Sequence, residues 1–222
     1  MAALDRSALA ARYHAVKTSL PAHVTLVAVS KTRSVEEIQA LYDLGHRAFG
    51  ENYPQELREK CPVLPADIEW HFIGHLQRSN VKHVVPIAHL IHGIDGEKLL
   101  DEVQKRAIAL GRTVDVLLQV HIAQEETKHG FSPVEVDQLL SRPWPWSHVR
   151  LRGLMGMATN TADEQLVSSE FEGLARLFRR SQVHVGPNFD SLSMGMSGDA
   201  ALAITAGSTL VRVGTAIFGE RP

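Results

Sequence analysis

Residues 24–31 read Val-Thr-Leu-Val-Ala-Val-Ser-Lys, an apolar run that ends in a lysine. This run predicts a buried strand over residues 24–30, at whose mouth Lys31 stands as the last residue. An ammonium group is poorly solvated there, and poor solvation favours the neutral amine. The neutral amine is the nucleophilic form of a lysine.

Strand-like and helix-like segments alternate along the rest of the chain. Seven further runs predict strands at residues 48–50, 70–74, 89–92, 114–120, 149–155, 191–194 and 210–213. Helices are predicted over residues 97–110, 134–140 and 163–180, from Pro54 onward, and from a capping box at Ser34 and Glu37 to near Gly45. Eight alternations in 222 residues favour an α/β fold of the (β/α)8 barrel type over an open sheet.

The bulk composition is that of one soluble domain spanning residues 1–222, because no linker or low-complexity tract divides the chain. A net charge of −2 gives no global field that would attract nucleic acid or an anionic membrane. The single cysteine, Cys61, excludes an intrachain disulfide and fits a reducing compartment. No apolar stretch approaches the roughly 20 residues of a membrane span, and the N-terminus lacks a signal pattern. A cytoplasmic location is therefore expected.

Two turns rich in Gly, Ser and Thr follow the last two predicted strands, one at Ser197 and Gly198 and the other at Gly214 and Thr215. In a (β/α)8 barrel these are the loops that bind phosphate. Glycine lets the backbone approach the phosphate closely, while hydroxyl and backbone N–H groups donate hydrogen bonds. An amine such as that of Lys31 and a phosphate-binding site in one pocket are the least that is needed to hold pyridoxal phosphate as a Schiff base.

The last predicted strand also carries an arginine. With a period of two, Leu210 and Arg212 share one face, while Val211 and Val213 share the other. An arginine inside a barrel is costly unless it meets a partner, and a pyridine nitrogen is one candidate. Because a guanidinium keeps its proton, that nitrogen would stay unprotonated and the cofactor would be a poor electron sink. An interior carboxylate such as Glu51 is the competing partner.

Motifs along nearly the whole chain carry a family resemblance. They lie at residues 27–31, 49–53, 70–77, 127–131, 154–158, 192–199 and 207–214. In this order they resemble the pyridoxal phosphate homeostasis proteins, which are related to the barrel domain of bacterial alanine racemase. The resemblance implies a single fold-type III barrel that binds pyridoxal phosphate.

The resemblance also implies the residues of the site. Lys31 would form the internal aldimine and Arg212 would face the ring nitrogen. The phosphate would be bound by Ser197, Gly214 and Thr215, and Asn52 would lie near the cofactor. Two simpler alternatives stay open: Lys31 as a solvated lysine at a strand end, and Asn52 as a cap of the next helix.

The implied function is cofactor homeostasis: a monomer that buffers pyridoxal phosphate, delivers it to apo-enzymes and turns over little or no substrate. One alternative is a fold-type III enzyme such as an amino-acid racemase. That chemistry normally needs a second base, often a tyrosine, and the chain has only Tyr13, Tyr42 and Tyr53. A second alternative is a barrel that binds another phosphorylated metabolite, with Lys31 as a counter-charge.

Two further signals bear on other sites. The family usually shows Asn-Lys shortly after the residues that match Leu76 and Gln77, whereas this chain has Arg-Ser-Asn at residues 78–80. This leaves open whether a second cofactor site exists. His71 and His75 have the i, i+4 spacing of helical metal ligands, but their segment is predicted as strand and turn. No cysteine cluster supports a metal site, so none is expected.

Overall fold

A computed structural model describes residues 4–125 and 129–220 of the chain. Eight parallel strands close into a barrel in chain order, with β8 paired to β1, which confirms the predicted (β/α)8 architecture. The strands are β1 (Thr25–Val29), β2 (Ala48–Glu51), β3 (Glu69–Phe72), β4 (Leu90–Ile94), β5 (Val114–Val120), β6 (Val149–Gly156), β7 (Ser191–Ser193) and β8 (Leu210–Val213).

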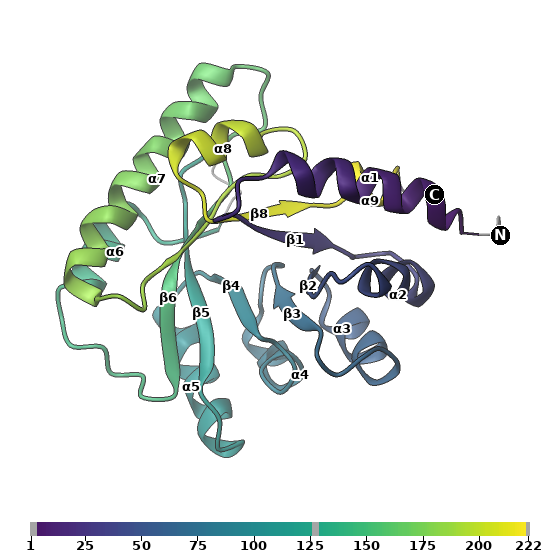
Figure 1. Ribbon diagram of the computed structural model, residues 1–222. Coiled ribbons are helices and arrows are strands. Elements are labelled where there is room, and N and C mark those ends of the chain that lie inside the picture. The colour runs from purple at the N-terminus through teal and green to yellow at the C-terminus, as the bar shows by residue number, and fades with distance from the viewer. Residues whose placement is uncertain (1–3, 126–128, 221–222) are drawn as a thin grey trace.

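Helices surround the barrel (Figure 1). They are α1 (Arg6–Ser19), α2 (Val35–Asp43), α3 (Pro54–Lys60), α4 (Val81–Val84), α5 (Glu97–Ala109), α6 (Pro133–Leu140), α7 (Glu164–Val185), α8 (Ala200–Ala206) and α9 (Thr215–Phe218), with 3-10 turns η1 (Cys61–Val63) and η2 (Arg78–Asn80). The predicted capping box at Ser34 and Glu37 starts α2. In Figure 1, α1 lies beside α9, and Arg12 Nε donates to the carbonyl of Ile217 over 2.8 Å.

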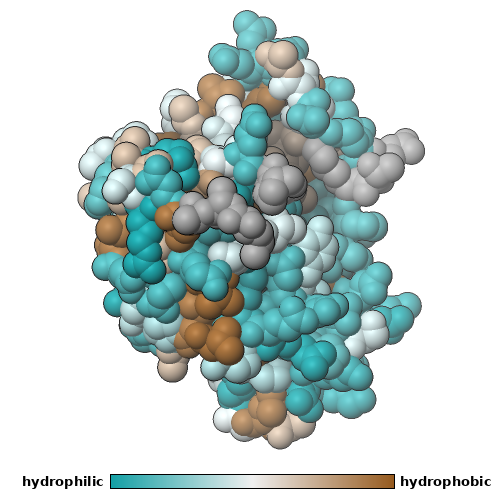
Figure 2. All heavy atoms as spheres, turned by 90° about the vertical axis from the view of Figure 1, so that its right-hand side faces the viewer, coloured by the Kyte–Doolittle hydropathy of each residue, from teal (hydrophilic) through white to brown (hydrophobic). Residues whose placement is uncertain are grey.

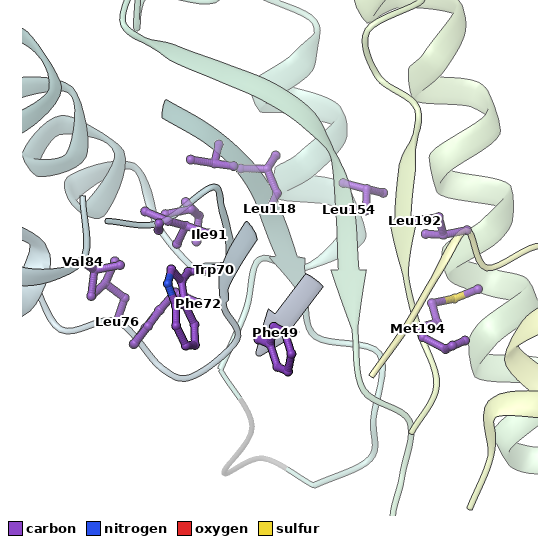
Figure 3. Close-up of a cluster of buried hydrophobic side chains, with 14 of the residues drawn as sticks. Phe49, Trp70, Phe72, Leu76, Val84, Ile91, Leu118, Leu154, Leu192 and Met194 are labelled. Carbon is purple, nitrogen blue, oxygen red and sulfur yellow. The ribbon is translucent and has the colours of Figure 1, made fainter. Parts of the chain in front are cut away.

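Two apolar layers hold these elements together. The larger one fills the space between the barrel and the helices. Figure 3 shows it with outward-facing side chains such as Phe49, Phe72 and Leu154. The smaller layer fills the barrel interior with Val27, Leu90, Leu117, Met155 and Leu210. Burying an aliphatic or aromatic side chain of this size contributes about 1.5–3 kcal/mol, so the larger outer layer supplies most of the hydrophobic stabilisation.

The alternation predicted for β8 is confirmed. Leu210 belongs to the inner layer, whereas Val211 and Val213 belong to the outer one. The predicted end of the first strand is wrong: β1 ends at Val29, and Lys31 lies two residues farther along, in a turn. The last hydrogen bonds of a strand depend on its neighbours, which is why a local apolar run does not fix this end.

Two short helices, α4 and α8, were not predicted, and α7 runs on to Val185, past the predicted end at Arg180. Among the described helices, including the 22-residue α7, none has the apolar length that a membrane crossing requires. The face shown in Figure 2 is largely hydrophilic, with apolar residues in small separate groups.

Candidate functional site

A cavity of about 250 Å³ opens beyond the carboxyl ends of β1, β7 and β8. Five of the six residues predicted for the site line it: Lys31, Ser197, Arg212, Gly214 and Thr215. Val29, Arg33, Met196 and Gly198 complete its lining. The volume is slightly below the range of about 300–1,000 Å³ that is usual for small-molecule sites. The position is the one where barrels carry their active groups.

Asn52, the sixth predicted residue, does not line this cavity. The alternative that it caps the next helix is wrong, because the N-cap of α3 is Tyr53. Asn52 Oδ1 is buried without a hydrogen-bond partner among the described residues. A buried amide oxygen of this kind calls for a donor, so a place for Asn52 near a bound cofactor stays a prediction.

Lys31 reaches the cavity from a strained turn. Val27 and Val29 face the barrel interior, and Lys31 continues their two-residue phase. Of the residues that the structure describes, Thr32 is the only non-glycine residue with a positive φ, at 62°. A β-branched residue in this conformation costs on the order of 1–3 kcal/mol. The surrounding structure must therefore hold the turn in place.

A buried ion pair behind the turn provides one such hold. Glu51 points away from the barrel interior and is 0% exposed. Its Oε1 accepts hydrogen bonds from Ser30 Oγ over 2.6 Å and from Lys60 Nζ over 2.8 Å. Lys60 Nζ also donates to the carbonyl of Ser30 over 2.8 Å. Burial raises the pKa of the Glu51 carboxyl, although the charge of Lys60 and the two hydrogen bonds oppose the shift.

Glu56 extends this arrangement, which we call the clamp: Ser30, Glu51, Glu56 and Lys60. Glu56 Oε2 accepts from Lys60 Nζ over 2.6 Å and from the backbone N–H of Thr32 over 2.7 Å. The residues on either side of Lys31 are therefore tied to α3. This keeps the lysine aimed at the cavity.

Arg212 lies inside the barrel, as predicted, and is 4% exposed. Its Nη1 donates to Ser193 Oγ over 2.5 Å and to the Ser193 carbonyl over 3.0 Å, and its Nη2 donates to the carbonyl of Gly156 over 3.2 Å. Burial lowers the pKa of Arg212 to about 10, against the opposing charge of Asp199. The guanidinium is thus still protonated at neutral pH. The competing pairing with Glu51 is wrong, since Glu51 belongs to the clamp.

The two glycine turns also line the cavity. The backbone N–H of Met196 donates to Asp199 Oδ1 over 2.6 Å, which closes the first turn over Ser197. In the second turn, a Cβ on Gly214 would lie 3.3 Å from Cβ of Val29, tighter than most such contacts. Glycine at this position therefore lets the strand ends approach closely and keeps the cavity floor open.

Two supporting residues were not predicted from the sequence. Arg33 Nη2 donates to the carbonyls of Gly219, over 2.5 Å, and Glu220, over 3.2 Å, which ties the turn of Lys31 to the end of α9. Ser193 holds Arg212 by two bonds. The two-residue phase of β7 is the signal that could have found it, because Leu192 lies in the outer layer and its neighbour therefore faces inward.

The two histidines weighed as metal ligands do not converge. His71 is buried, whereas His75 Nδ1 lies 3.2 Å from Asp95 Oδ2 and its ring stacks on that of His129. His75, Asp95 and His129 offer ligand atoms within 4.8 Å of one another. The two stacked ring planes are only 23° apart, so their in-plane lone pairs do not point at a common ion. Binding a metal there would require a ring to rotate.

Comparison with known proteins places this chain. The family model of the alanine racemase N-terminal domain matches residues 4–222. A pyridoxal phosphate homeostasis protein of Vibrio alginolyticus is 40% identical over 206 residues, which cover 90% of this chain and 88% of that protein. This chain belongs to the pyridoxal phosphate homeostasis protein family. The predicted resemblance is confirmed, although residues 127 and 128 of one motif lie outside the described residues.

Solved structures agree with membership in the pyridoxal phosphate homeostasis protein family. PipY of Synechococcus elongatus without pyridoxal phosphate superposes with a TM-score of 0.90 at 32% identity, covering 95% of this chain and all of PipY. The structure of PipY with pyridoxal phosphate bound gives a TM-score of 0.82. Alanine racemase of Clostridium difficile, 16% identical, covers 97% of this chain and 56% of its own length with a TM-score of 0.76, which shows a shared barrel fold alone.

Proposed function

We propose that this chain binds pyridoxal phosphate covalently at Lys31 and acts as a carrier and buffer of the cofactor, with little or no turnover. The observation that carries the proposal is the single cavity lined by Lys31, Arg212 and both glycine turns. Membership in the homeostasis family and the bound cofactor in PipY support it.

The donor set of the cavity fits this cofactor. Lys31 offers an amine, and Ser197 and Thr215 offer hydroxyl groups at turns suited to a phosphate. When bound, pyridoxal phosphate supplies an aldehyde that reacts with amines and a ring that withdraws electrons. The Lys31 amine would condense with that aldehyde, forming a carbon–nitrogen double bond and releasing one water. Asn52 Oδ1, buried without a partner among the described residues, adds an acceptor near this end of the barrel.

Two features favour a carrier over a racemase. With a pKa of about 10, Arg212 keeps its proton at neutral pH, so it can donate to a ring nitrogen but cannot protonate it fully. Among the residues that the structure describes, no tyrosine lines the cavity. Tyr13 is buried against His46, the hydroxyl of Tyr42 donates to Asp67, and Tyr53 lies at a different surface cavity. A ring bound next to Arg212 would therefore be a weak electron sink, and the described lining of the cavity offers no tyrosine base.

The proposal extends to where and with whom the protein works. We place it in the cytoplasm, because its one cysteine suits a reducing compartment, and we take it to be a monomer, because the family resemblance favours one. Its recipients would be apo-enzymes that depend on pyridoxal phosphate. Arg78 and Lys82 are the cations that could serve a second cofactor site near η2, in place of the expected family lysine.

The test is the visible absorption spectrum of the purified protein before and after borohydride, followed by peptide mass mapping. We expect a yellow band that disappears on reduction, with a pyridoxyl group on Lys31. Lys31→Ala should remove both, whereas Lys105→Ala, at an exposed position on α5, should change neither. A protein that stays colourless and unmodified in excess pyridoxal phosphate would favour a barrel for another phosphorylated metabolite. Racemisation of an amino acid that depends on Lys31 would favour the enzyme.

A further inference from the structure

A hydrogen-bonded chain crosses the barrel interior from Arg212. Arg212 Nη1 lies 2.5 Å from Ser193 Oγ, Ser193 Oγ lies 3.0 Å from His92 Nδ1, and His92 Nε2 lies 2.9 Å from His71 Nδ1. The four residues are on β8, β7, β4 and β3 and are 4%, 0%, 0% and 3% exposed. We call this set the interior chain. It ends at a cavity lined by His71 at the opposite mouth of the barrel.

The direction of the bonds follows from pairing the hydrogen of Ser193. A guanidinium only donates, so Ser193 Oγ accepts from Arg212, and among the described residues His92 Nδ1 is the acceptor within reach of the Ser193 hydroxyl hydrogen. A neutral imidazole has one donor and one acceptor nitrogen, so His92 donates from Nε2 to His71 Nδ1. His71 must then carry its hydrogen on Nε2. That atom is buried with no partner among the described residues.

Both imidazoles are neutral for a physical reason. Burial, the neighbouring His71 and the charge of Arg212 hold the pKa of His92 well below its ordinary value. Burial, followed by the neighbouring His89 and His46, lowers the pKa of His71 to about 3. Within the interior chain, Arg212 at the cofactor cavity therefore carries the one positive charge, and Ser193, His92 and His71 are neutral.

Burying these polar side chains costs more free energy than burying leucines, which fill other interior positions of the same barrel. Neighbouring interior positions hold Leu90, Leu117 and Leu210, which need no partners. A polar side chain buried among them costs free energy unless every donor and acceptor is paired, and the last donor of the interior chain is not. Of the four residues in the interior chain, Arg212 is the one that lines the candidate site.

We propose that Ser193 and His92 are positioning residues that hold the Arg212 guanidinium at the cofactor cavity in one orientation. This inference rests on the proposed function. Ser193 takes one edge of the guanidinium through its hydroxyl and carbonyl, and His92 in turn fixes the direction of that hydroxyl. The edge of Arg212 that lines the cavity is then presented to a bound ring without having to reorganise.

The test compares variants that remove hydrogen bonds of the interior chain with variants that keep them. Ser193→Ala and His92→Leu remove them. Ser193→Thr keeps the hydroxyl, and His92→Asn keeps an acceptor near the position of Nδ1. We expect Ser193→Ala and His92→Leu to shift the absorption maximum of bound pyridoxal phosphate and raise its Kd about tenfold, the effect of losing one hydrogen bond to a charged group. Ser193→Thr and His92→Asn should keep the absorption maximum and the Kd close to those of the wild type. Ser181→Ala, at a buried serine on α7, is the control for loss of a buried hydroxyl.

Nitrogen NMR of the histidine side chains in the cofactor-free wild type tests the chain without any variant. We expect His71 and His92 as neutral Nε2–H tautomers at pH 7. A charged His92, or one protonated on Nδ1, would overturn the inference. So would unchanged spectra and Kd in folded Ser193→Ala while the wild type binds the cofactor. A wild type that takes up no pyridoxal phosphate would overturn the proposed function first and this inference with it.

Discussion

Replacing Lys60 with methionine removes the cation of the clamp and keeps a side chain of similar length. Glu51 would then be fully buried with Ser30 as its remaining partner. Removing one member of a buried ion pair costs about 3–5 kcal/mol, because the other charge is left uncompensated. For a chain of this size, 1 kcal/mol lowers Tm by about 2–4 °C, so the expected fall is about 6–20 °C.

The deficit should depend on pH. Burial raises the folded-state pKa of Glu51 above its ordinary 4.5, and loss of Lys60 removes the charge that opposes this shift. A carboxyl with a raised pKa binds more protons in the folded than in the unfolded state. Its cost is therefore absent below about pH 4.5 and grows as pH rises through the folded pKa. The difference between Lys60→Met and wild type should shrink from pH 7 to pH 5.

Urea unfolding at both pH values measures this. Lys105→Met, at an exposed position, should stay within about 0.5 kcal/mol of wild type. The double variant Glu51→Gln/Lys60→Met should recover most of the loss, since no charge is then buried alone and the amide oxygen still accepts from Ser30. A Lys60→Met protein within about 1 kcal/mol of wild type at pH 7, or a deficit independent of pH, would refute the reasoning.

Three more expectations follow from local geometry. Gly153 has φ +155° and a Cβ there would lie 1.7 Å from the Ser191 carbonyl oxygen, so Gly153→Ala should cost at least about 3 kcal/mol in urea unfolding; a smaller loss would mean that β6 shifts freely. Burial lowers the pKa of His46 to about 4, so between pH 6.5 and pH 4 the unfolded chain binds a proton that the folded protein does not. The free energy of unfolding should therefore fall by about 1.4 kcal/mol per pH unit over this range. His46→Phe should reduce the slope of the free energy of unfolding against pH, and an unchanged slope would contradict this. Ser197→Ala should raise the Kd for pyridoxal phosphate about 13- to 160-fold by fluorescence titration, as for the loss of one hydrogen bond to a charged phosphate. An unchanged Kd would remove Ser197 from the phosphate site.

The barrel and the floor of its cavity could be predicted from the sequence because both follow from local periodicity. The two-residue period of β8 places Arg212 inside and its valine neighbours outside, whatever the rest of the chain does. The turns after β7 and β8 could likewise be predicted from their content of Gly, Ser and Thr. Short elements were missed for the same reason, since a four-residue helix such as α4 is too short to show a period.

The supports of the site could not be predicted, because they join residues that are distant in sequence. His92 and Ser193 are 101 positions apart, and Ser30 and Glu51 are 21 apart. The two-residue phase of a strand can show that such a residue faces inward, as for Ser193, but it does not show which residue it meets. The strand and helix register decides which of them meet. The positive φ of Thr32 is also invisible in the sequence, since threonine disfavours it and only the tertiary contacts of its turn hold it there.

Lys31 and Arg212 are thus held by separate networks of residues on opposite faces of the sheet. The clamp holds the turn of Lys31 from outside the barrel with paired charges, whereas the interior chain holds Arg212 from inside with neutral groups. The two networks share no residue, so their perturbations should be independent. Lys60→Met combined with Ser193→Ala should therefore lose the sum of the two single effects on stability, within about 0.5 kcal/mol. A larger departure in a double-mutant cycle would mean that the turn of Lys31 and the guanidinium of Arg212 are coupled through the cavity itself.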